Sequence, residues 1–213
     1  MSEPRTRGAR ILSLGDSYTI GESVDAADRW PVRLARGLRA RGIATADAVI
    51  IARTGWTTDE LNAAIDAASP DDGFDLVTLL IGVNNQYRGR SSEDYRSELR
   101  ELLARAVSFA GSQPSRVLAI SIPDWGATPF AAESGRDVSK IGAEIDAFNA
   151  VGRDEAARAG VRFVDITPIS RRARQELGLM AGDGLHPSGA MYEEWSEEIL
   201  PAALEALAAG RQL

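Results

Sequence analysis

Short apolar runs alternate along the chain with longer stretches of helical periodicity, and this alternation limits the folds available to it. The apolar runs cover Ile11–Leu14, Ala48–Ala52, Leu76–Ile81, Val117–Ile122 and Val161–Val164. Most of them are continuous rather than alternating, which is typical of strands covered on both faces. The pattern predicts an α/β fold, a single-domain three-layer α/β/α sandwich built on a doubly wound, flavodoxin-like parallel sheet of about five strands.

Five amphipathic stretches predict the helices of the two outer layers. They run from Asp28 or Arg29 to Arg41, from Thr57 to Pro70, over Ser92–Ala110, over Ser139–Ala159, and from Ser188 through Ile199. Thr57 and Glu60 have the spacing of a capping box, and Pro201 is expected to kink or restart the last helix. The 213 residues show no internal repeat and no linker, so we expect one domain over residues 1–213.

Charge and composition exclude several classes of partner and site. The net charge of −7 gives no attraction to nucleic acid or to an anionic membrane surface. The chain has no cysteine, which excludes thiolate nucleophiles, disulfides and cysteine-based metal sites. No apolar run approaches the roughly 20 residues of a membrane span, and Ile11–Leu14 is too short for the core of a signal peptide. We therefore expect a cytoplasmic protein; the sequence carries no signal for its oligomeric state.

The first apolar run ends in Gly15-Asp16-Ser17, and a polar loop is expected after it. Open parallel sheets bind ligands at the carboxyl ends of their strands, so Ser17 is the first candidate for chemistry. Serine and aspartate also cap helices and form turns, so this signal alone is weak. If the strand order is 2-1-3-4-5, the ligand-binding crevice lies between Gly15–Ser17 and Gly82–Asn85.

A base for Ser17 is available at one position in the chain. A serine hydroxyl is a poor nucleophile until a neighbouring base takes its proton, and histidine is the usual base near neutral pH. His186 is the only histidine, and Asp183 lies three residues before it. A carboxylate at that spacing can accept a hydrogen bond from Nδ1 and fix the tautomer. We therefore expect Ser17 to attack, His186 to carry the proton and Asp183 to orient the imidazole.

Four separated stretches together resemble the SGNH, or GDSL-type, hydrolases. They are GDS at Gly15–Ser17, Gly55 after the second strand, GVN at Gly82–Asn84 and DGLHP at Asp183–Pro187, in the family's order and over nearly the whole chain. The resemblance implies a serine hydrolase that cleaves carboxylic esters through an acyl-enzyme intermediate, with no cofactor and no metal. It also implies an oxyanion hole formed by the backbone N–H groups of Ser17 and Gly55 and the side-chain amide of Asn84.

Two positions depart from the family's pattern. Tyr18 stands where the first block often has leucine, and this can alter the pocket beside the nucleophile. Asn85 stands where the third block often has aspartate. An amide has one acceptor oxygen instead of a carboxylate, so Asn85 can only partly imitate the bonding that holds this loop.

The substrate is less defined than the chemistry. Trp56, Tyr87 and Trp125 each follow a strand's carboxyl end, and we expect them to line the acyl or alcohol pocket. Pro123–Val138 reads as a long surface loop or lid. The family includes esterases, lipases, thioesterases and carbohydrate deacetylases, and the chain length favours a small-molecule ester with a short acyl group.

Two other functions remain open from the sequence. One is a flavodoxin-like module that binds a phosphate or nucleotide at the Gly15–Ser17 loop without hydrolase activity, although no Gly-rich phosphate-binding fingerprint is present. The other is a metal-dependent phosphohydrolase that uses Asp16, Asp183 and His186, which is disfavoured by the single histidine and the lack of clustered ligands.

Overall fold

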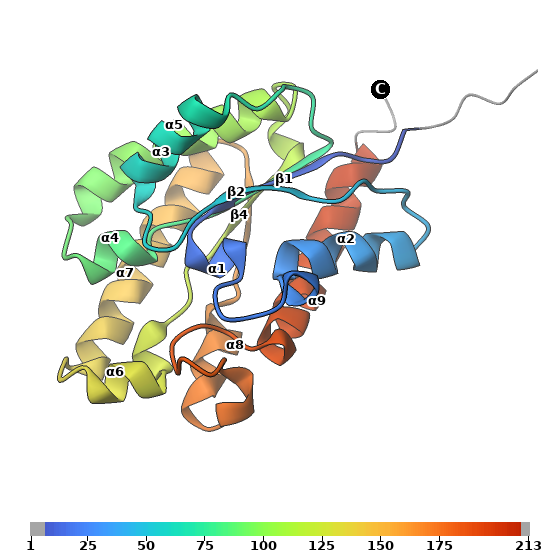
Figure 1. The fold of residues 1–213 in the computed structure, drawn as a ribbon. Helices are drawn as coiled ribbons and strands as arrows, with labels where there is room; N and C mark the ends of the chain where they lie inside the picture. Colours follow the sequence, from blue (N-terminus) through green and yellow to red (C-terminus); the bar gives the residue numbers. More distant parts are fainter. Residues whose placement is uncertain (1–6, 210–213) are drawn as a thin grey trace, which may run out of the picture.

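The apolar runs form one five-stranded, all-parallel sheet in a computed structural model, which describes residues 7–209 (Figure 1). The strands are β1 (Ile11–Gly15), β2 (Val49–Ala52), β3 (Leu76–Leu80), β4 (Val117–Ile120) and β5 (Arg162–Val164). Their order is β2-β1-β3-β4-β5. The expected doubly wound sheet is confirmed, with the strand order that places a crevice between the ends of β1 and β3.

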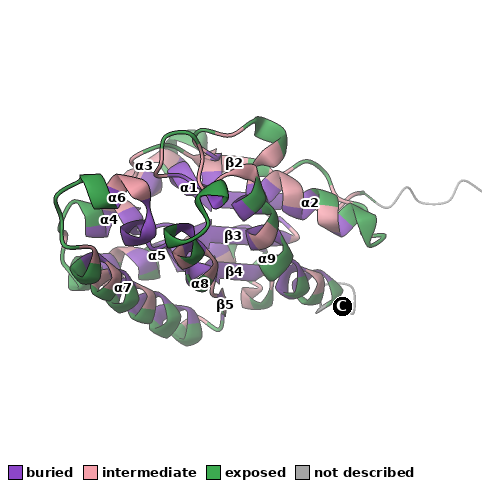
Figure 2. Ribbon diagram, turned by 90° about the horizontal axis from the view of Figure 1, so that it is seen from below, coloured by how far each residue is buried: buried purple, intermediate pink, exposed green. Residues whose placement is uncertain are grey.

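Burial across the sheet follows the character of the apolar runs. Strands β1, β3 and β4 are buried at every residue, as continuous apolar runs predict. The edge strand β2 is only partly covered, and Val49 at its start is 46% exposed. Figure 2 shows the central strands buried between helices whose outer faces are exposed.

Nine helices of the α type lie in the described part of the chain. They are α1 (Ser17–Ile20), α2 (Trp30–Ala40), α3 (Thr58–Ala68), α4 (Val83–Tyr87), α5 (Ser92–Phe109), α6 (Pro129–Glu133), α7 (Val138–Arg158), α8 (Thr167–Arg171) and α9 (Gly189–Ala209). Helices α2 and α9 pack together on one face of the sheet, and α3, α5 and α7 cover the other (Figure 1). No helix within residues 7–209 combines the length and the apolar character needed to cross a membrane.

Four of the five long helices, α2, α3, α5 and α7, match the predicted stretches to within a few residues. Helices α3 and α5 begin with the expected capping signals. The Thr57 side chain caps α3, and the Glu60 side chain returns to the Thr57 N–H at 2.9 Å. Ser91 caps α5 by accepting from the N–H of Asp94 at 3.0 Å. Helix α9 begins next to Ser188 as expected but continues through Pro201 to Ala209, well past Ile199. Of the kink or restart expected at Pro201, the restart does not occur.

Two loops expected from the sequence are different in the structure. The polar loop after the first strand begins with the four-residue helix α1. Pro123–Val138 is not a surface loop along its whole length, because Pro123–Thr128 is buried and only residues 132–137 are consistently exposed. The burial is supported by Trp125, whose indole N–H donates to Gln86 Oε1 at 2.7 Å. This half of the segment is therefore a fixed wall of the molecule.

The sheet register brings three sequence blocks to one edge. Gly15 at the end of β1 pairs with Ala52 of β2 and with Leu80 of β3. The segments that follow these three residues carry Ser17, Gly55 and Asn84, and they therefore lie side by side.

Candidate active site

The nucleophile candidate Ser17 is the first residue of α1, directly after β1. Asp16 caps this short helix, with Oδ1 accepting from the Tyr18 N–H at 3.0 Å. Gly15 allows the tight passage from strand to helix, because a Cβ at this position would lie 2.1 Å from Thr19 Oγ1 and 2.5 Å from the Leu80 carbonyl oxygen. The Ser17 N–H stands at a helix start, where no preceding helical turn supplies an acceptor for it.

Asp16, directly before Ser17, lies in an environment that disfavours its charge. Its side chain is fully buried, and Oδ2 has no hydrogen-bond partner among the described residues. Burial raises the pKa of the Asp16 carboxyl from 3.8 to about 7, against the lowering effect of hydrogen bonds from the backbone of Tyr18 and of Asp16 itself. Asp16 therefore stabilises α1 as a cap while carrying a desolvation cost at neutral pH.

Asp183 and His186 form a hydrogen-bonded pair in the turn before α9. His186 Nδ1 lies 2.7 Å from Asp183 Oδ2, and Asp183 Oδ1 accepts from the backbone N–H groups of Leu185 and His186 at 2.9 Å each. Ser23 donates its hydroxyl to the same Oδ2 at 2.6 Å. Partial burial opposes ionisation of Asp183, but these hydrogen bonds outweigh it and hold the pKa of this carboxyl well below its usual value. The carboxylate is thus ionised and ready to stabilise an imidazolium.

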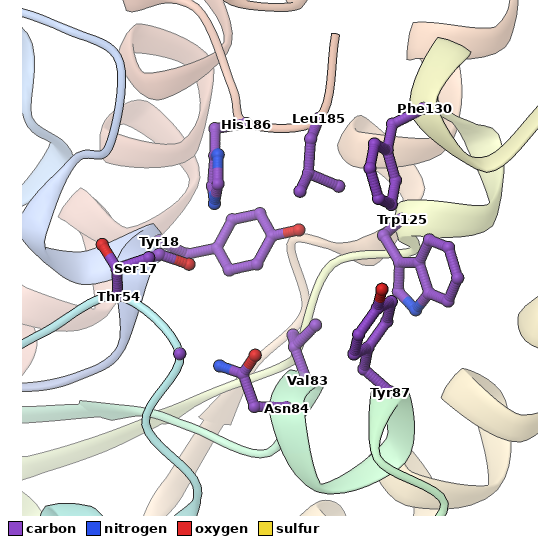
Figure 3. Close-up of a pocket in the computed structure, with 11 residues that line it drawn as sticks. Ser17, Tyr18, Thr54, Val83, Asn84, Tyr87, Trp125, Phe130, Leu185 and His186 are labelled. Carbon is purple, nitrogen blue, oxygen red and sulfur yellow. The ribbon is translucent and has the colours of Figure 1, made fainter. Parts of the chain in front are cut away.

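Ser17 and His186 lie on the wall of the same cavity (Figure 3). Because Nδ1 of His186 is engaged by Asp183, Nε2 is the nitrogen that can take the serine proton. The imidazole packs against the Tyr18 ring, with 5.2 Å between ring centroids. The described residues show no hydrogen bond between Ser17 Oγ and Nε2, a contact that often tightens only when substrate binds.

The two other expected oxyanion donors also line this cavity. Gly55 adopts a φ of +86°, a conformation that favours glycine. The Asn84 side chain donates one N–H to the Trp56 carbonyl at 3.0 Å, which fixes the amide and leaves its second N–H available. Ser17, Gly55 and Asn84 are therefore brought together as the sequence predicted.

Asn85 holds the loop next to Asn84 in spite of its departure from the family's pattern. Its side chain is fully buried, Oδ1 accepts from the Thr58 N–H at 3.1 Å, and Nδ2 donates to Thr58 Oγ1 at 2.6 Å. An amide supplies the one acceptor and the one donor that Thr58 requires. Asn85 thus joins α4 to the start of α3.

The cavity beside Ser17 has a volume of about 200 Å³ and is mostly apolar away from Ser17 and His186. The apolar part is lined by Val83, Tyr87, Trp125, Phe130 and Leu185. Figure 3 shows the Tyr18 phenol extending across the cavity, with its hydroxyl directed toward these side chains.

The three predicted aromatic positions have different places in the structure. Tyr87 and Trp125 line the cavity and meet edge to face, with 5.2 Å between their centroids. The Trp56 side chain is not among the lining residues and packs against the core instead. Trp56 contributes to the site through its carbonyl, which holds Asn84.

Three residues at the site were not predicted from the sequence. Phe130 lines the cavity from α6, within the stretch expected to be a loop. Leu185 directly precedes His186 in the fourth block, and its place in the cavity wall could have been predicted from this position. Ser23 reaches Asp183 across 160 residues of sequence, and no local pattern marks it.

The residues of the metal-dependent alternative do not gather into a ligand set. Asp183 is bonded to His186 and Ser23, and Asp16 is buried beneath α1. Within residues 7–209, no group of three or more histidine and carboxylate side chains is placed to hold a metal ion.

Solved structures with the same fold cover nearly all of the chain. TesA shares 22% sequence identity with a TM-score of 0.72, over 93% of this chain and 99% of that one. The acetylxylan esterase Axe2 from Geobacillus stearothermophilus shares 19% at a TM-score of 0.70, over 92% and 94% of the two chains. The psychrotrophic esterase EstA from Pseudoalteromonas sp., in a structure inhibited by monoethylphosphonate, shares 18% at a TM-score of 0.63, over 93% and 98%.

The family comparison gives a more specific result than these structures, whose low identity shows the fold alone. Comparison with curated protein sequences gave no significant match. The model of the GDSL-like lipase/acylhydrolase family matches residues 13–194, which include all four sequence blocks. The chain belongs to the GDSL-like lipase/acylhydrolase family and is a carboxylic ester hydrolase.

Proposed function

We propose that this enzyme hydrolyses small, short-acyl carboxylic esters through an acyl-enzyme intermediate on Ser17. The observation that carries the proposal is the 2.7 Å bond from His186 Nδ1 to Asp183, with the imidazole and Ser17 on the wall of one cavity. This arrangement supplies a nucleophile, a base and an ionised group that orients the base. Gly55 and Asn84 border the same cavity and supply donors for the oxyanion.

The first half of the reaction acylates Ser17. Its Oγ forms a bond to the ester carbonyl carbon while the Oγ proton passes to His186 Nε2. The carbonyl oxygen becomes an oxyanion that accepts from the N–H groups of Ser17, Gly55 and Asn84. The bond to the leaving alkoxide then breaks, and the imidazolium returns its proton to that oxygen.

The second half releases the acid. Water adds to the acyl carbon while His186 Nε2 takes one of its protons, and the same donors hold the second oxyanion. The bond from carbon to Ser17 Oγ breaks, and the proton returns to the serine. Asp183 keeps its negative charge throughout, which its lowered pKa favours.

The dimensions of the cavity support a short acyl group. Its volume of about 200 Å³ is smaller than the roughly 300–1,000 Å³ of sites that hold drug-sized ligands. Trp125 is fully buried, and Phe130 and Leu185 line the same apolar part of the cavity. An acetyl or butyryl chain fits this space better than a long lipid chain. The acetylxylan esterase Axe2 has the same fold and suggests an acetylated sugar as one test substrate.

The test is a panel of p-nitrophenyl esters from acetate to decanoate, together with an acetylated sugar, assayed with wild-type enzyme and Ser17→Ala. We expect acetate or butyrate to give the highest kcat/KM, and Ser17→Ala to lose nearly all turnover. Ser97→Ala removes an exposed hydroxyl from α5 and serves as the matched control, with wild-type rates expected. Equal turnover by Ser17→Ala and wild type would end the mechanism, and a maximum at decanoate would end the short-acyl proposal. Calorimetry with nucleotides and flavin tests the binding-module alternative in parallel.

A further inference from the structure

The segment after α1 contains a serine in an unfavourable backbone conformation. Within residues 7–209, three non-glycine residues have a positive φ: Ser23 (64°), Ser69 (42°) and Ser112 (59°). This left-handed region is disfavoured for residues that carry a Cβ, and glycine would adopt it freely. Such conformations persist where surrounding contacts hold them, so the contacts of Ser23 indicate what its side chain does.

The Ser23 hydroxyl donates to Asp183 Oδ2 at 2.6 Å. The same oxygen is bonded to His186 Nδ1 at 2.7 Å. Oδ1 is held by the backbone of its own turn, through Leu185 and His186. Among the described residues, Ser23 is thus the one hydrogen-bond donor to this carboxylate from outside the Asp183–His186 turn.

Asp183 needs such an anchor because it is open to solvent on one side. Its side chain is 32% exposed, whereas the His186 side chain is 9% exposed. A carboxylate at a solvent boundary can rotate toward water, and this rotation would move Oδ2 away from Nδ1. A hydroxyl that donates to Oδ2 restricts the rotation and fixes the oxygen that faces the histidine.

The neighbouring residue makes a second connection to the site. The Glu22 carboxylate accepts from the Thr54 hydroxyl, and Thr54 lines the cavity next to Gly55. In Figure 1 the blue segment after α1 runs beside the orange-red segment before α9, in agreement with the bond from Ser23 to Asp183. Glu22 and Ser23 therefore connect the segment after α1 to the loop that carries Gly55 and to the turn that carries Asp183.

We propose that Ser23 is a positioning residue for the reaction, which locks Asp183 Oδ2 onto His186 Nδ1 and so keeps the imidazole directed at Ser17. This inference rests on the proposed function, because Ser23 acts through the Asp183–His186 pair and does not touch substrate. It also explains why a serine stands at a φ of 64° where glycine would be less strained.

The test compares variants that are expected to change the stability of the protein and the fixed position of Asp183 in opposite directions. Ser23→Gly removes the hydroxyl and relieves the backbone, so its Tm should equal or exceed that of wild type. Ser23→Thr keeps the hydroxyl but places a β-branched residue at positive φ, so its Tm should fall. Ser112→Gly is the matched control, because it relieves the same conformation at an exposed residue outside the site.

We expect kcat of Ser23→Gly to fall about tenfold with KM changed less than about twofold, whereas Ser23→Thr stays within about threefold of wild-type kcat. The chain has one histidine, so the downfield Nδ1–H proton signal in NMR spectra belongs to His186. This signal should shift or broaden in Ser23→Gly and stay unchanged in Ser112→Gly.

Wild-type kcat together with an unchanged Nδ1–H signal in Ser23→Gly would overturn the positioning role. The role would also be overturned if kcat of Ser23→Gly, wild type and Ser23→Thr followed the order of their Tm values. The Ser17→Ala variant, assayed in parallel, separates this failure from failure of the proposed function. If Ser17→Ala is inactive while Ser23→Gly is fully active, only the inference about Ser23 is lost. If Ser17→Ala is fully active, the mechanism itself is wrong.

Discussion

The stability of the enzyme should depend on pH through Asp16, and the structure gives the size of the effect. The folded protein holds the proton of this buried carboxyl up to a pKa of about 7, compared with the usual 3.8. Because the folded pKa is raised, this contribution to stability is fully present below pH 3.8 and is lost as the pH rises through 7. At about 1.4 kcal/mol for each pKa unit, the whole loss is about 4 kcal/mol, of which about 2.5 kcal/mol falls between pH 5 and pH 8.

The variant Asp16→Asn isolates this contribution. Asparagine keeps an acceptor oxygen for the Tyr18 N–H but carries no titrating proton. The free energy of unfolding, measured by urea titration at pH 5 and at pH 8, should change by about 2.5 kcal/mol more for wild type than for Asp16→Asn. Other titrating groups cancel in the difference between the two proteins. If the difference in free energy of unfolding between wild type and Asp16→Asn is the same at pH 5 and at pH 8, the reasoning is refuted.

Three further predictions address the oxyanion hole, the pocket and the scaffold. Asn84→Ala should lower kcat about 100- to 1,000-fold with little change in KM, and steady-state rates that fall less than tenfold would contradict its role. Tyr18→Leu should raise the ratio of kcat/KM for hexanoate over acetate by about tenfold, because Tyr18 lines both the cavity and a smaller neighbouring space, and leucine is smaller than tyrosine; an unchanged ratio would exclude Tyr18 as a limit on chain length. Glu155→Gln should destabilise the protein by about 3 kcal/mol at pH 7. Hydrogen bonds and charge from Arg100, Arg96 and Arg158 hold the pKa of buried Glu155 at about 2, so its contribution is present above pH 4.5 and is lost as the pH falls toward 2. Urea unfolding at pH 7 and pH 3 should therefore show the two proteins converging in acid, and equal stability at pH 7 would contradict the prediction.

The strands and long helices were predictable because each carries a local signal. Strands β1, β3 and β4 are continuous apolar runs, and helices α3 and α5 begin at capping residues that the structure confirms. Helix α1 was missed because four residues are too few for a periodic pattern. Its stability comes from the Asp16 cap and from burial of Ser17, Tyr18 and Thr19.

The stretch Pro123–Val138 shows how tertiary contacts can override composition. Its glycine and proline content is typical of a surface loop. The structure buries Trp125 against Gln86 and pairs buried Asp124 with Arg171 at 2.9 Å. Both partners lie far away in the sequence, so no window around Trp125 contains the information that places it.

The candidate site residues carried a clearer sequence signal than the residues that support them. Ser17, Asp183 and His186 belong to short blocks whose residue types match those that the proposed reaction requires. The contact of Ser23 with Asp183 could not be predicted, because the two residues are 160 positions apart. The left-handed conformation of Ser23 could not be predicted either, because serine rarely adopts it. The role expected for the Trp56 side chain assumed that a residue after a strand points into the crevice, and in the structure it packs against the core.

The most direct test of the account is intact mass spectrometry after reaction with diethyl p-nitrophenyl phosphate, which traps an activated serine. We predict one phosphoryl adduct per chain, located on Ser17 by peptide mapping, absent in Ser17→Ala and formed far more slowly in His186→Ala. An adduct on another residue, or equal labelling of wild type and His186→Ala, would contradict the claim that His186 activates Ser17.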